Sequence, residues 1–208
     1  PHMAVVITVM NMKGGVGKST VAMHVGGLLA LQKRALDGKG RRVLLIDYDP
    51  QFNLSQALLK ATTYFALEKA GTTVLSVLQE DLSTLNPFSL QVPANTSPPN
   101  VATLAQRVRR FSSGGYLDLV PSTLDLMYVA VGSAAGSVAT LEARYAAFIA
   151  EVRANYDVVL IDCHPAGSIL TKTSLGNSDC VLVPVVAHQF AARGISLMQK
   201  FVAASKPI

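Results

Sequence analysis

Short apolar runs alternate with segments of helical period along most of this chain. Each run is rich in valine, leucine or isoleucine and is bounded by glycine, proline or polar residues, which is typical of buried strands. The runs predict strands at residues 4–10, 42–47, 116–120, 157–162 and 180–186. Apolar residues at three- and four-residue spacing predict helices near 19–36, 53–60, 72–79, 123–131, 137–154, 168–176 and 191–204. This alternation predicts an α/β fold, in which helices flank both faces of a mostly parallel central sheet.

Residues 81–115 interrupt the regular pattern. They hold four prolines and a Gly-Gly pair, and charged residues are few before Arg107. We expect a loop-rich insertion with one short helix near 101–111. The chain of 208 residues fits one domain, which we place at 3–208. Residues 1–2 are interpreted as the remnant of an expression tag.

Composition narrows the function classes only a little. Half of the residues are hydrophobic and 15% are charged, so the chain is globular rather than disordered. The formal net charge of +5 is compatible with nucleic acid or an acidic membrane, but it does not by itself indicate a partner. The two cysteines form no CxxC pair, which favours a cytoplasmic protein over a disulfide-stabilised one. No apolar run reaches the ~18 residues of a membrane span, so no transmembrane segment is predicted.

A glycine-rich loop joins the first predicted strand to the first predicted helix. Its sequence is Lys13-Gly14-Gly15-Val16-Gly17-Lys18-Ser19-Thr20. Such a loop points backbone N–H groups at phosphate oxygens, and the helix dipole favours their negative charge. In the pattern GxxxxGK[ST], Lys18 reaches the β- and γ-phosphates and the Ser19 hydroxyl ligates Mg²⁺. Met12 takes the place of the pattern's first glycine, and Lys13 adds a second lysine.

Three aspartates end two of the predicted strands. Asp47 and Asp49 flank the end of the second strand, and Asp162 closes a run of four apolar residues. Ligands of α/β proteins bind at the carboxyl ends of strands, so these carboxylates are expected near the phosphate loop. A carboxylate there can orient a water toward a γ-phosphate, although either Asp47 or Asp49 can instead cap the following turn. Asp162 is expected to hold Mg²⁺ through water.

These motifs together resemble those of a known family. The loop 13–20 resembles the deviant Walker A loop of the ParA/MinD family of ATPases, in which a substituted first glycine and an added lysine are the defining features. Residues 43–51 resemble the family's second motif, and residues 158–162 resemble its Walker B strand. The likeness spans residues 4–204 in order with 81–115 unmatched, and the sequence Asp-Pro-Gln within the second motif is closest to ParA-type members.

The resemblance implies a P-loop ATPase that binds ATP or ADP with Mg²⁺. It makes Lys13, Lys18, Asp49 and Asp47 the candidate catalytic residues. Lys18 would hold the phosphates of its own nucleotide, and Lys13 would reach across a homodimer interface to the partner's nucleotide. Asp49 would orient the attacking water. The metal shell would include Ser19, Asp162 and Asp47.

The resemblance also implies a use for the ATPase. ATP would drive dimerisation as a switch, and the dimer would bind DNA non-specifically. A partner protein would stimulate a weak hydrolysis, so that a plasmid, chromosome or protein cargo is partitioned or positioned in the cytoplasm, on the nucleoid. One alternative is a MinD-like membrane switch, although no basic amphipathic segment precedes Ile208. Another is a metabolic enzyme of the deviant P-loop group.

Several residues near these motifs have a less specific interpretation. The sequence Cys163-His164-Pro165-Ala166 departs from the small-polar-Pro-Pro stretch usual in the family. His164 is interpreted as a partly exposed loop histidine, because no second ligand lies at metal-binding spacing. Cys163 and Cys180 are expected to be buried at strand ends. Arg107, Arg109 and Arg110 form a basic patch that either contacts phosphate or is a solvated helix face, with Arg107 and Arg110 on one side of that helix.

Overall fold

A single mixed sheet forms the centre of the protein. The computed structural model describes residues 3–82, 85–86, 88–132, 137–164, 166–187 and 191–205. Within these residues the sheet has six strands in the order β3-β4-β2-β5-β1-β6, and only β3 runs antiparallel to its neighbour. The strands are β1 Val5–Val9, β2 Arg42–Tyr48, β3 Gln106–Arg110, β4 Tyr116–Val120, β5 Val158–Cys163 and β6 Cys180–Leu182. The predicted α/β fold with a mostly parallel sheet is confirmed.

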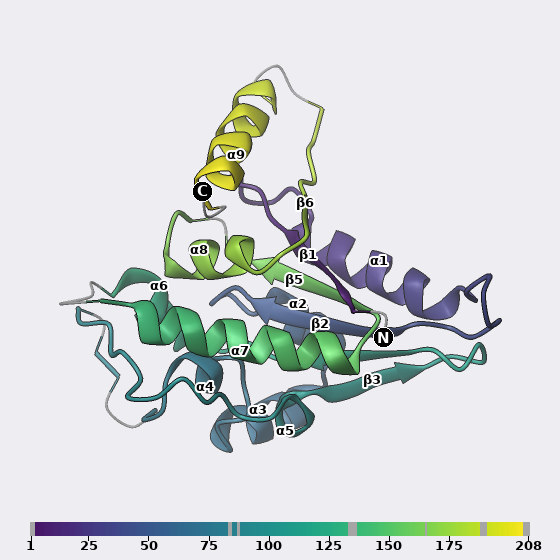
Figure 1. Cartoon of the computed structure of the whole chain (residues 1–208), viewed down its shortest axis with the longest axis horizontal. Coiled ribbons are helices and arrows are strands. Elements are labelled where there is room, and N and C mark those ends of the chain that lie inside the picture. Colours follow the sequence, from purple (N-terminus) through teal and green to yellow (C-terminus); the bar gives the residue numbers. More distant parts are fainter. Residues whose placement is uncertain are drawn as a thin grey trace.

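Helices cover both faces of the sheet (Figure 1). In chain order they are α1 Lys18–Leu31, α2 Asn53–Leu58, α3 Ala61–Lys69, α4 Leu75–Leu78, α5 Val101–Leu104, α6 Leu126–Val131, α7 Ala139–Asn155, α8 Ile169–Gly176 and α9 Ala191–Ser205. Helix α1 packs on one face against β2, β4 and β5, while α7 and α8 contact β5 from the other. Helix α9 contacts α8 and extends away from the sheet. No helix among these is both long enough and apolar enough to cross a membrane.

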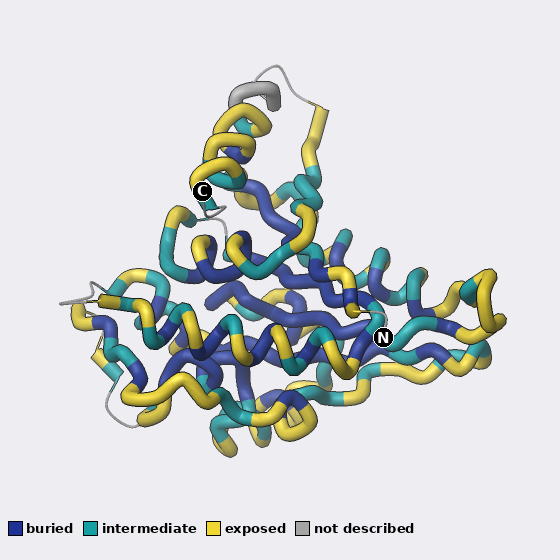
Figure 2. Tube along the Cα trace, viewed as in Figure 1, coloured by how far each residue is buried: buried dark blue, intermediate teal, exposed yellow. Residues whose placement is uncertain are grey.

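Alternation along each strand divides the core into two layers. In β2, Val43 and Leu45 pack toward α1, whereas Leu44, Ile46 and Tyr48 pack toward α7. Figure 2 shows the central strands buried along most of their length. Strands buried on both faces read as continuous apolar runs, which is why the sequence pattern located them. The same alternation places Asp47 on the α1 side of the sheet, away from Tyr48.

Helix α1 approaches the sheet closely because Gly26 has no side chain. A Cβ added there would lie 2.9 Å from Leu45 Cδ2 and 3.2 Å from Leu160 Cδ1. The helix ends at Leu31, five residues before the predicted end at 36. The chain then forms a tight loop in which Arg34 N–H donates to Lys39 O at 2.8 Å and Gly38 adopts a positive φ of 69°. The predicted helix was therefore five residues too long at its C-terminal end.

The segment 81–115 differs most from the prediction. The expected helix near 101–111 is only the four-residue α5, and the next residues form β3. Arg107 and Arg110 therefore do not share a helix face. The Arg107 guanidinium pairs with Asp118 of β4 and lies 3.7 Å from the Tyr116 ring centroid. These cross-strand contacts favour an edge strand despite its polar sequence.

Three smaller predictions were also wrong. Helix α3 was not predicted at all. Of the strand expected at 180–186, only β6 at Cys180–Leu182 forms. Cys163 is buried as expected, but Cys180 is exposed because it opens a sheet-edge strand. The expected tag remnant at residues 1–2 lies outside the described part of the chain.

Candidate nucleotide-binding site

The glycine-rich loop leaves β1 and ends in the first turn of α1. Gly15 and Gly17 have φ values of 71° and 82°, a region that side chains rarely adopt, and Gly17 is the N-cap of α1. Since Gly17 has no side chain, no cap competes for the first N–H groups of the helix. The predicted loop is therefore shaped to bind an anion at a helix start, as phosphate loops do.

A residue that the sequence analysis missed holds this loop in place. Asn11 is 5% exposed, and its Oδ1 accepts a hydrogen bond from Lys13 N–H at 3.0 Å. Its Nδ2 donates to Pro184 O at 2.8 Å. Asn11 thus joins the loop to the segment after β6, and only the pairing of β6 with β1 brings the two together.

The two lysines of the loop have different surroundings. Lys18 is half-buried at the start of α1, close enough for its positive charge to act against a rise in the pKa of both Asp49 and Asp162. Lys13 is exposed, as are Gly14, Gly15, Gly17 and Thr20, while Val16 and Ser19 are half-buried. The structure therefore brings Lys18 to the carboxylates, while Lys13 stays on the open side of the loop.

Asp162 ends the apolar run of β5 beside Ser19. It is 1% exposed, and neither of its oxygens accepts a hydrogen bond of ordinary geometry from any described residue. Burial raises its pKa to about 6, although the Ser19 hydroxyl and the Lys18 charge oppose the rise. Two buried oxygens without a hydrogen bond of ordinary geometry to a described residue are a costly arrangement unless a cation is bound. The site therefore fits Mg²⁺, which needs one or two carboxylates and completes its shell with water and phosphate oxygens.

Asp47 lies directly beside Asp162 in the parallel register of β2 and β5. It is fully buried, and its Oδ2 accepts hydrogen bonds from Ser55 N–H at 2.8 Å and Ser55 Oγ at 2.7 Å. Burial raises its pKa to about 8, and the Asp162 charge adds to the rise. These bonds attach the start of α2 to the end of β2. Asp47 thus organises the loop that carries Asp49.

Asp49 follows β2 and is 6% exposed. Its Oδ1 accepts a hydrogen bond from Gln51 N–H at 3.0 Å and lies 3.1 Å from His164 Nδ1. Burial alone would raise the pKa of Asp49, but the bonds to His164 and Gln51 outweigh it and lower the pKa below its usual value. Asp49 is therefore a carboxylate at neutral pH, next to Lys18. The sequence placed His164 nearby but contained no sign of this contact.

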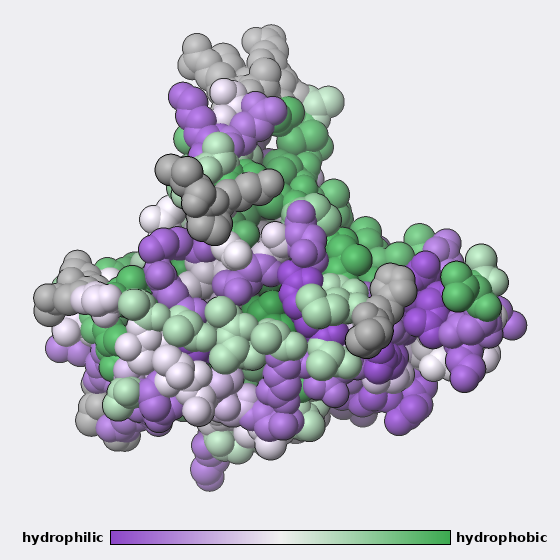
Figure 3. Space-filling view, viewed as in Figure 1, coloured by the Kyte–Doolittle hydropathy of each residue, from purple (hydrophilic) through white to green (hydrophobic). Residues whose placement is uncertain are grey.

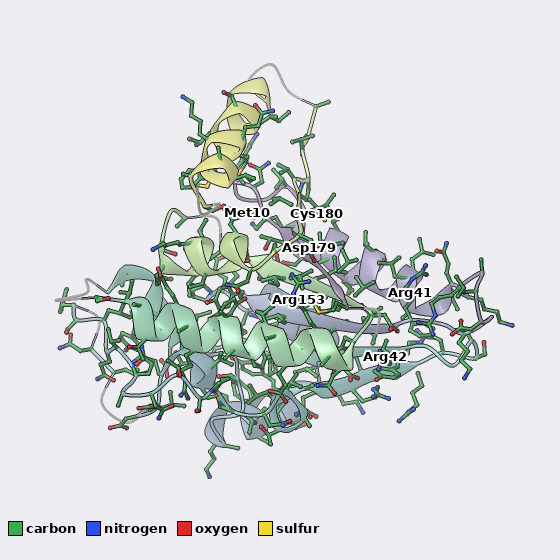
Figure 4. The ribbon with its side chains drawn as sticks, in the orientation of Figure 1. Met10, Arg41, Arg42, Arg153, Asp179 and Cys180 are labelled. Carbon is green, nitrogen blue, oxygen red and sulfur yellow. The ribbon has the colours of Figure 1, made fainter. Side chains whose placement is uncertain are left out.

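The site lies at the carboxyl end of the parallel strands. In Figure 4, Met10 marks the end of β1 where the loop begins, and Arg41 and Arg42 mark the opposite end of β2. Lys18 lies near both Asp49 and Asp162, and Ser19 lies near Asp162, at the end of the sheet where α/β folds bind ligands. Among the described residues no cluster of three or more His, Cys, Asp or Glu could hold a metal without help from a ligand.

The chain is similar to proteins of chromosome and plasmid partition. A sequence profile of the AAA domain family matches residues 4–206. The sporulation initiation inhibitor protein Soj of Bacillus subtilis is 31% identical over 93% of this chain and 63% of its own length. The chromosome partitioning protein ParA of Caulobacter vibrioides is 31% identical over 94% of this chain and 61% of its own length. The chain thus spans less than two thirds of these curated relatives.

Solved structures share the fold. A putative plasmid partition protein from Borrelia burgdorferi bound to AMPPNP has a TM-score of 0.72 and 23% identity, covering 97% of this chain and 71% of that one. Cobyrinic acid a,c-diamide synthase from Mycobacterium smegmatis with ADP and magnesium has a TM-score of 0.67 and 27% identity, covering 97% and 68%. With a profile match over nearly the whole chain, this protein belongs to the AAA domain family of the ParA/MinD type.

Proposed function

We propose that this chain is the nucleotide-binding part of a ParA-like ATPase that hydrolyses ATP with Mg²⁺ and dimerises on ATP. The observation that carries the proposal is that Lys18 lies close to both Asp162 and Asp49 at the start of α1, in a loop with a second, exposed lysine. The partition functions named for the ParA relatives support it.

The residues divide the work of phosphoryl transfer, which depends on positioning and charge neutralisation. Lys18 and the first N–H groups of α1 hold the phosphates. Ser19 and Asp162 hold Mg²⁺, which neutralises charge on the phosphate oxygens when bound. Asp49 is ionised and lies beside Lys18, so it can accept a hydrogen bond from a water and direct that water at the γ-phosphate.

Lys13 acts in a second copy of the chain. It shares a loop with Lys18 but is exposed, and its backbone is fixed by Asn11. Its ammonium group is therefore free to meet the nucleotide of a partner, where it would act like an arginine finger.

Sizing the protein with ATP and Mg²⁺ tests the switch. We expect wild-type protein to dimerise on ATP, Lys13→Ala to stay monomeric, and Asp49→Ala to accumulate as an ATP-bound dimer. Lys69→Ala, which removes an exposed lysine in the last turn of α3, serves as the matched control and should behave as wild type. A dimer that forms equally without ATP would contradict the proposal.

We further propose that the dimer binds DNA non-specifically through a basic surface at the end of the sheet opposite the nucleotide. The loop after α1 and the turn after β3 meet there, because Gly40 N–H donates to Ser113 O at 2.8 Å. Figure 3 shows many hydrophilic side chains at this end. The basic residues of this surface are Lys33, Arg34, Lys39, Arg41, Arg42, Arg109 and Arg110. Asp37 and Asp157 pair with two of them, Arg34 and Arg42, so positive charge is in excess. Such an excess of positive charge attracts phosphate backbones without reading sequence.

Binding of arbitrary duplex DNA tests this surface. The double variant Arg109→Glu with Arg110→Glu should weaken ATP-dependent binding and reduce its salt dependence, by roughly one unit of slope for each phosphate that is no longer bound. Lys60→Glu is the control, because Lys60 is exposed but lies at the start of α3. Binding that is equal without ATP, or equal in the double variant, would contradict this part of the proposal.

A metabolic enzyme remains the second candidate, favoured by the 27% identity with the diamide synthase. The two functions differ in what hydrolysis requires. A ParA-like switch turns over ATP slowly without any small-molecule substrate. ATP hydrolysis that begins only when a carboxylic acid and an amine donor are added would favour the synthase.

A further inference from the structure

His164 contacts the residue to which the proposed function assigns the attacking water. The ring reaches Asp49 from the end of a different strand, 115 residues away in the sequence, with 3.1 Å between Nδ1 and Asp49 Oδ1. Both groups are largely enclosed, since the His164 side chain is 16% exposed and the Asp49 side chain 9%. A hydrogen bond at this depth is shielded from competing water and is therefore stronger than a surface contact.

The chemistry of the pair defines the direction of the hydrogen bond. Asp49 Oδ1 already accepts a hydrogen bond from Gln51 N–H, so it acts as an acceptor at this contact too. The ring must therefore carry its proton on Nδ1 and donate it to Asp49. The other donor to the same oxygen is Gln51 N–H, which belongs to the loop of Asp49 itself. His164 is thus the donor that holds the carboxylate from outside its own loop.

A second bond fixes the backbone of His164 to the same strand end. His164 N–H donates to Tyr48 O at 3.2 Å, extending the pairing of β2 and β5 by one residue. The histidine is therefore attached through both its backbone and its ring to the residues around Asp49. Its Cα cannot move away without breaking both contacts.

Lys18 is the competing partner for Asp49. The two are close enough for the Lys18 charge to lower the pKa of Asp49. A carboxylate released by His164 would be drawn to this ammonium group, which the proposed function reserves for phosphate. The imidazole holds Asp49 by a directional bond and so keeps it available to a water.

We propose that His164 is a positioning residue, which orients the Asp49 carboxylate toward the attacking water and keeps it from pairing with Lys18. The inference rests on the proposed function, because it acts through the role of Asp49. A metal-ligand role is not favoured, since the described residues around His164 form no group of three metal-binding side chains.

Steady-state ATP hydrolysis with four single variants tests the inference. We expect His164→Ala to lower kcat by between about tenfold and a hundredfold, the range for losing a hydrogen bond to a charged group, with KM for ATP unchanged. His164→Asn places an amide N–H at the position of Nδ1 and should restore most of kcat. His164→Gln places the amide N–H one bond further along the side chain and should not restore kcat. His24→Ala removes an exposed histidine of α1 and should match wild type.

A double-mutant cycle shows whether His164 acts through Asp49. In an Asp49→Ala background, His164→Ala should cause no further loss of kcat. Independent losses would overturn the inference, as would a wild-type kcat for His164→Ala or equal kcat values for the Ala and Asn variants. In the nucleotide-free protein, ¹⁵N shifts of the histidine ring should show an Nδ1–H tautomer that is lost in Asp49→Ala.

The failure of this inference and that of the proposed function give different results. If the wild-type protein does not hydrolyse ATP, or Asp49→Ala keeps the wild-type kcat, the proposed function fails and the inference fails with it. If Asp49→Ala is inactive while His164→Ala is fully active, only the positioning role is wrong.

Discussion

Replacing Asp162 with asparagine should stabilise the nucleotide-free protein while removing its response to Mg²⁺-nucleotide. Both Asp162 oxygens are buried next to Asp47, and neither has a hydrogen bond of ordinary geometry to a residue that the structure describes. Burial raises the folded-state pKa from 3.8 to about 6. A shift of about two pH units corresponds to roughly 3 kcal/mol of destabilisation at pH 7, where the carboxylate is charged in both states. The asparagine amide, itself short of partners, offsets part of this gain, so we expect a net stabilisation of about 2 kcal/mol.

The direction of the pH dependence follows from the same shift. A carboxyl group whose folded-state pKa is raised destabilises the protein once pH is above the unfolded value, and the cost grows until pH passes the folded value. The advantage of Asp162→Asn should therefore be full above about pH 6 and disappear below about pH 4. For a chain of this size, 2 kcal/mol corresponds to an increase in Tm of about 4–8 °C.

Thermal unfolding with and without Mg²⁺-ADP measures both effects. Wild-type Tm should rise on adding Mg²⁺-ADP, and the Asp162→Asn Tm should not. Asp118→Asn is the matched control, because Asp118 is also buried but accepts hydrogen bonds from Arg107 and from Tyr156 OH at 2.9 Å. This variant should lower Tm. An Asp162→Asn protein that is less stable than wild type at pH 7 without nucleotide would refute the reasoning.

Two further predictions concern the packing around the site. Gly26→Val should lower the free energy of unfolding in urea by about 1–3 kcal/mol, because the valine side chain would overlap Leu45. Gly27→Ala, with open space at its Cβ, should instead raise it by about 0.5–1 kcal/mol. Equal effects of the two substitutions would contradict the close approach of α1 to the sheet. Ser55→Ala should lower the free energy of unfolding by about 1–3 kcal/mol, since it removes the hydroxyl donor to buried Asp47. It should also accelerate hydrogen exchange of the α2 amides. Unchanged exchange would show that this bond does not hold the loop.

Much of the fold was predictable because its strands are buried on both faces. β1, β2, β4 and β5 appear as continuous apolar runs, and each was predicted to within two residues. β3 could not be predicted in this way, because its five residues include three arginines. It is a strand because β4 offers it a free edge and Asp118 binds Arg107. Helix α3 was missed for a related reason, since Tyr64 is its one buried residue and the apolar period is weak.

The candidate site was predictable as far as its chemistry lies within continuous segments. The loop from Lys13 to Thr20 carries its glycines, its lysines and its hydroxyl in one run of sequence. Asp49 follows the apolar strand β2, and Asp162 follows the apolar run within β5. The backbone angles of Gly15 and Gly17 agree with this interpretation. Local sequence determines these features, because a strand, a turn and a helix start are all local structures.

The remaining features depend on which strands become neighbours. The parallel register of β2 and β5 places Asp47 beside Asp162, whose charge adds to the rise in the pKa of Asp47 that burial causes. The same register brings His164 to Asp49. The sequence by itself therefore determined a glycine-rich loop with two lysines and the aspartates at the ends of two apolar runs. Only the tertiary structure decided which aspartate lies buried beside another carboxylate and which is held by a histidine, because those partners come from strands more than a hundred residues apart.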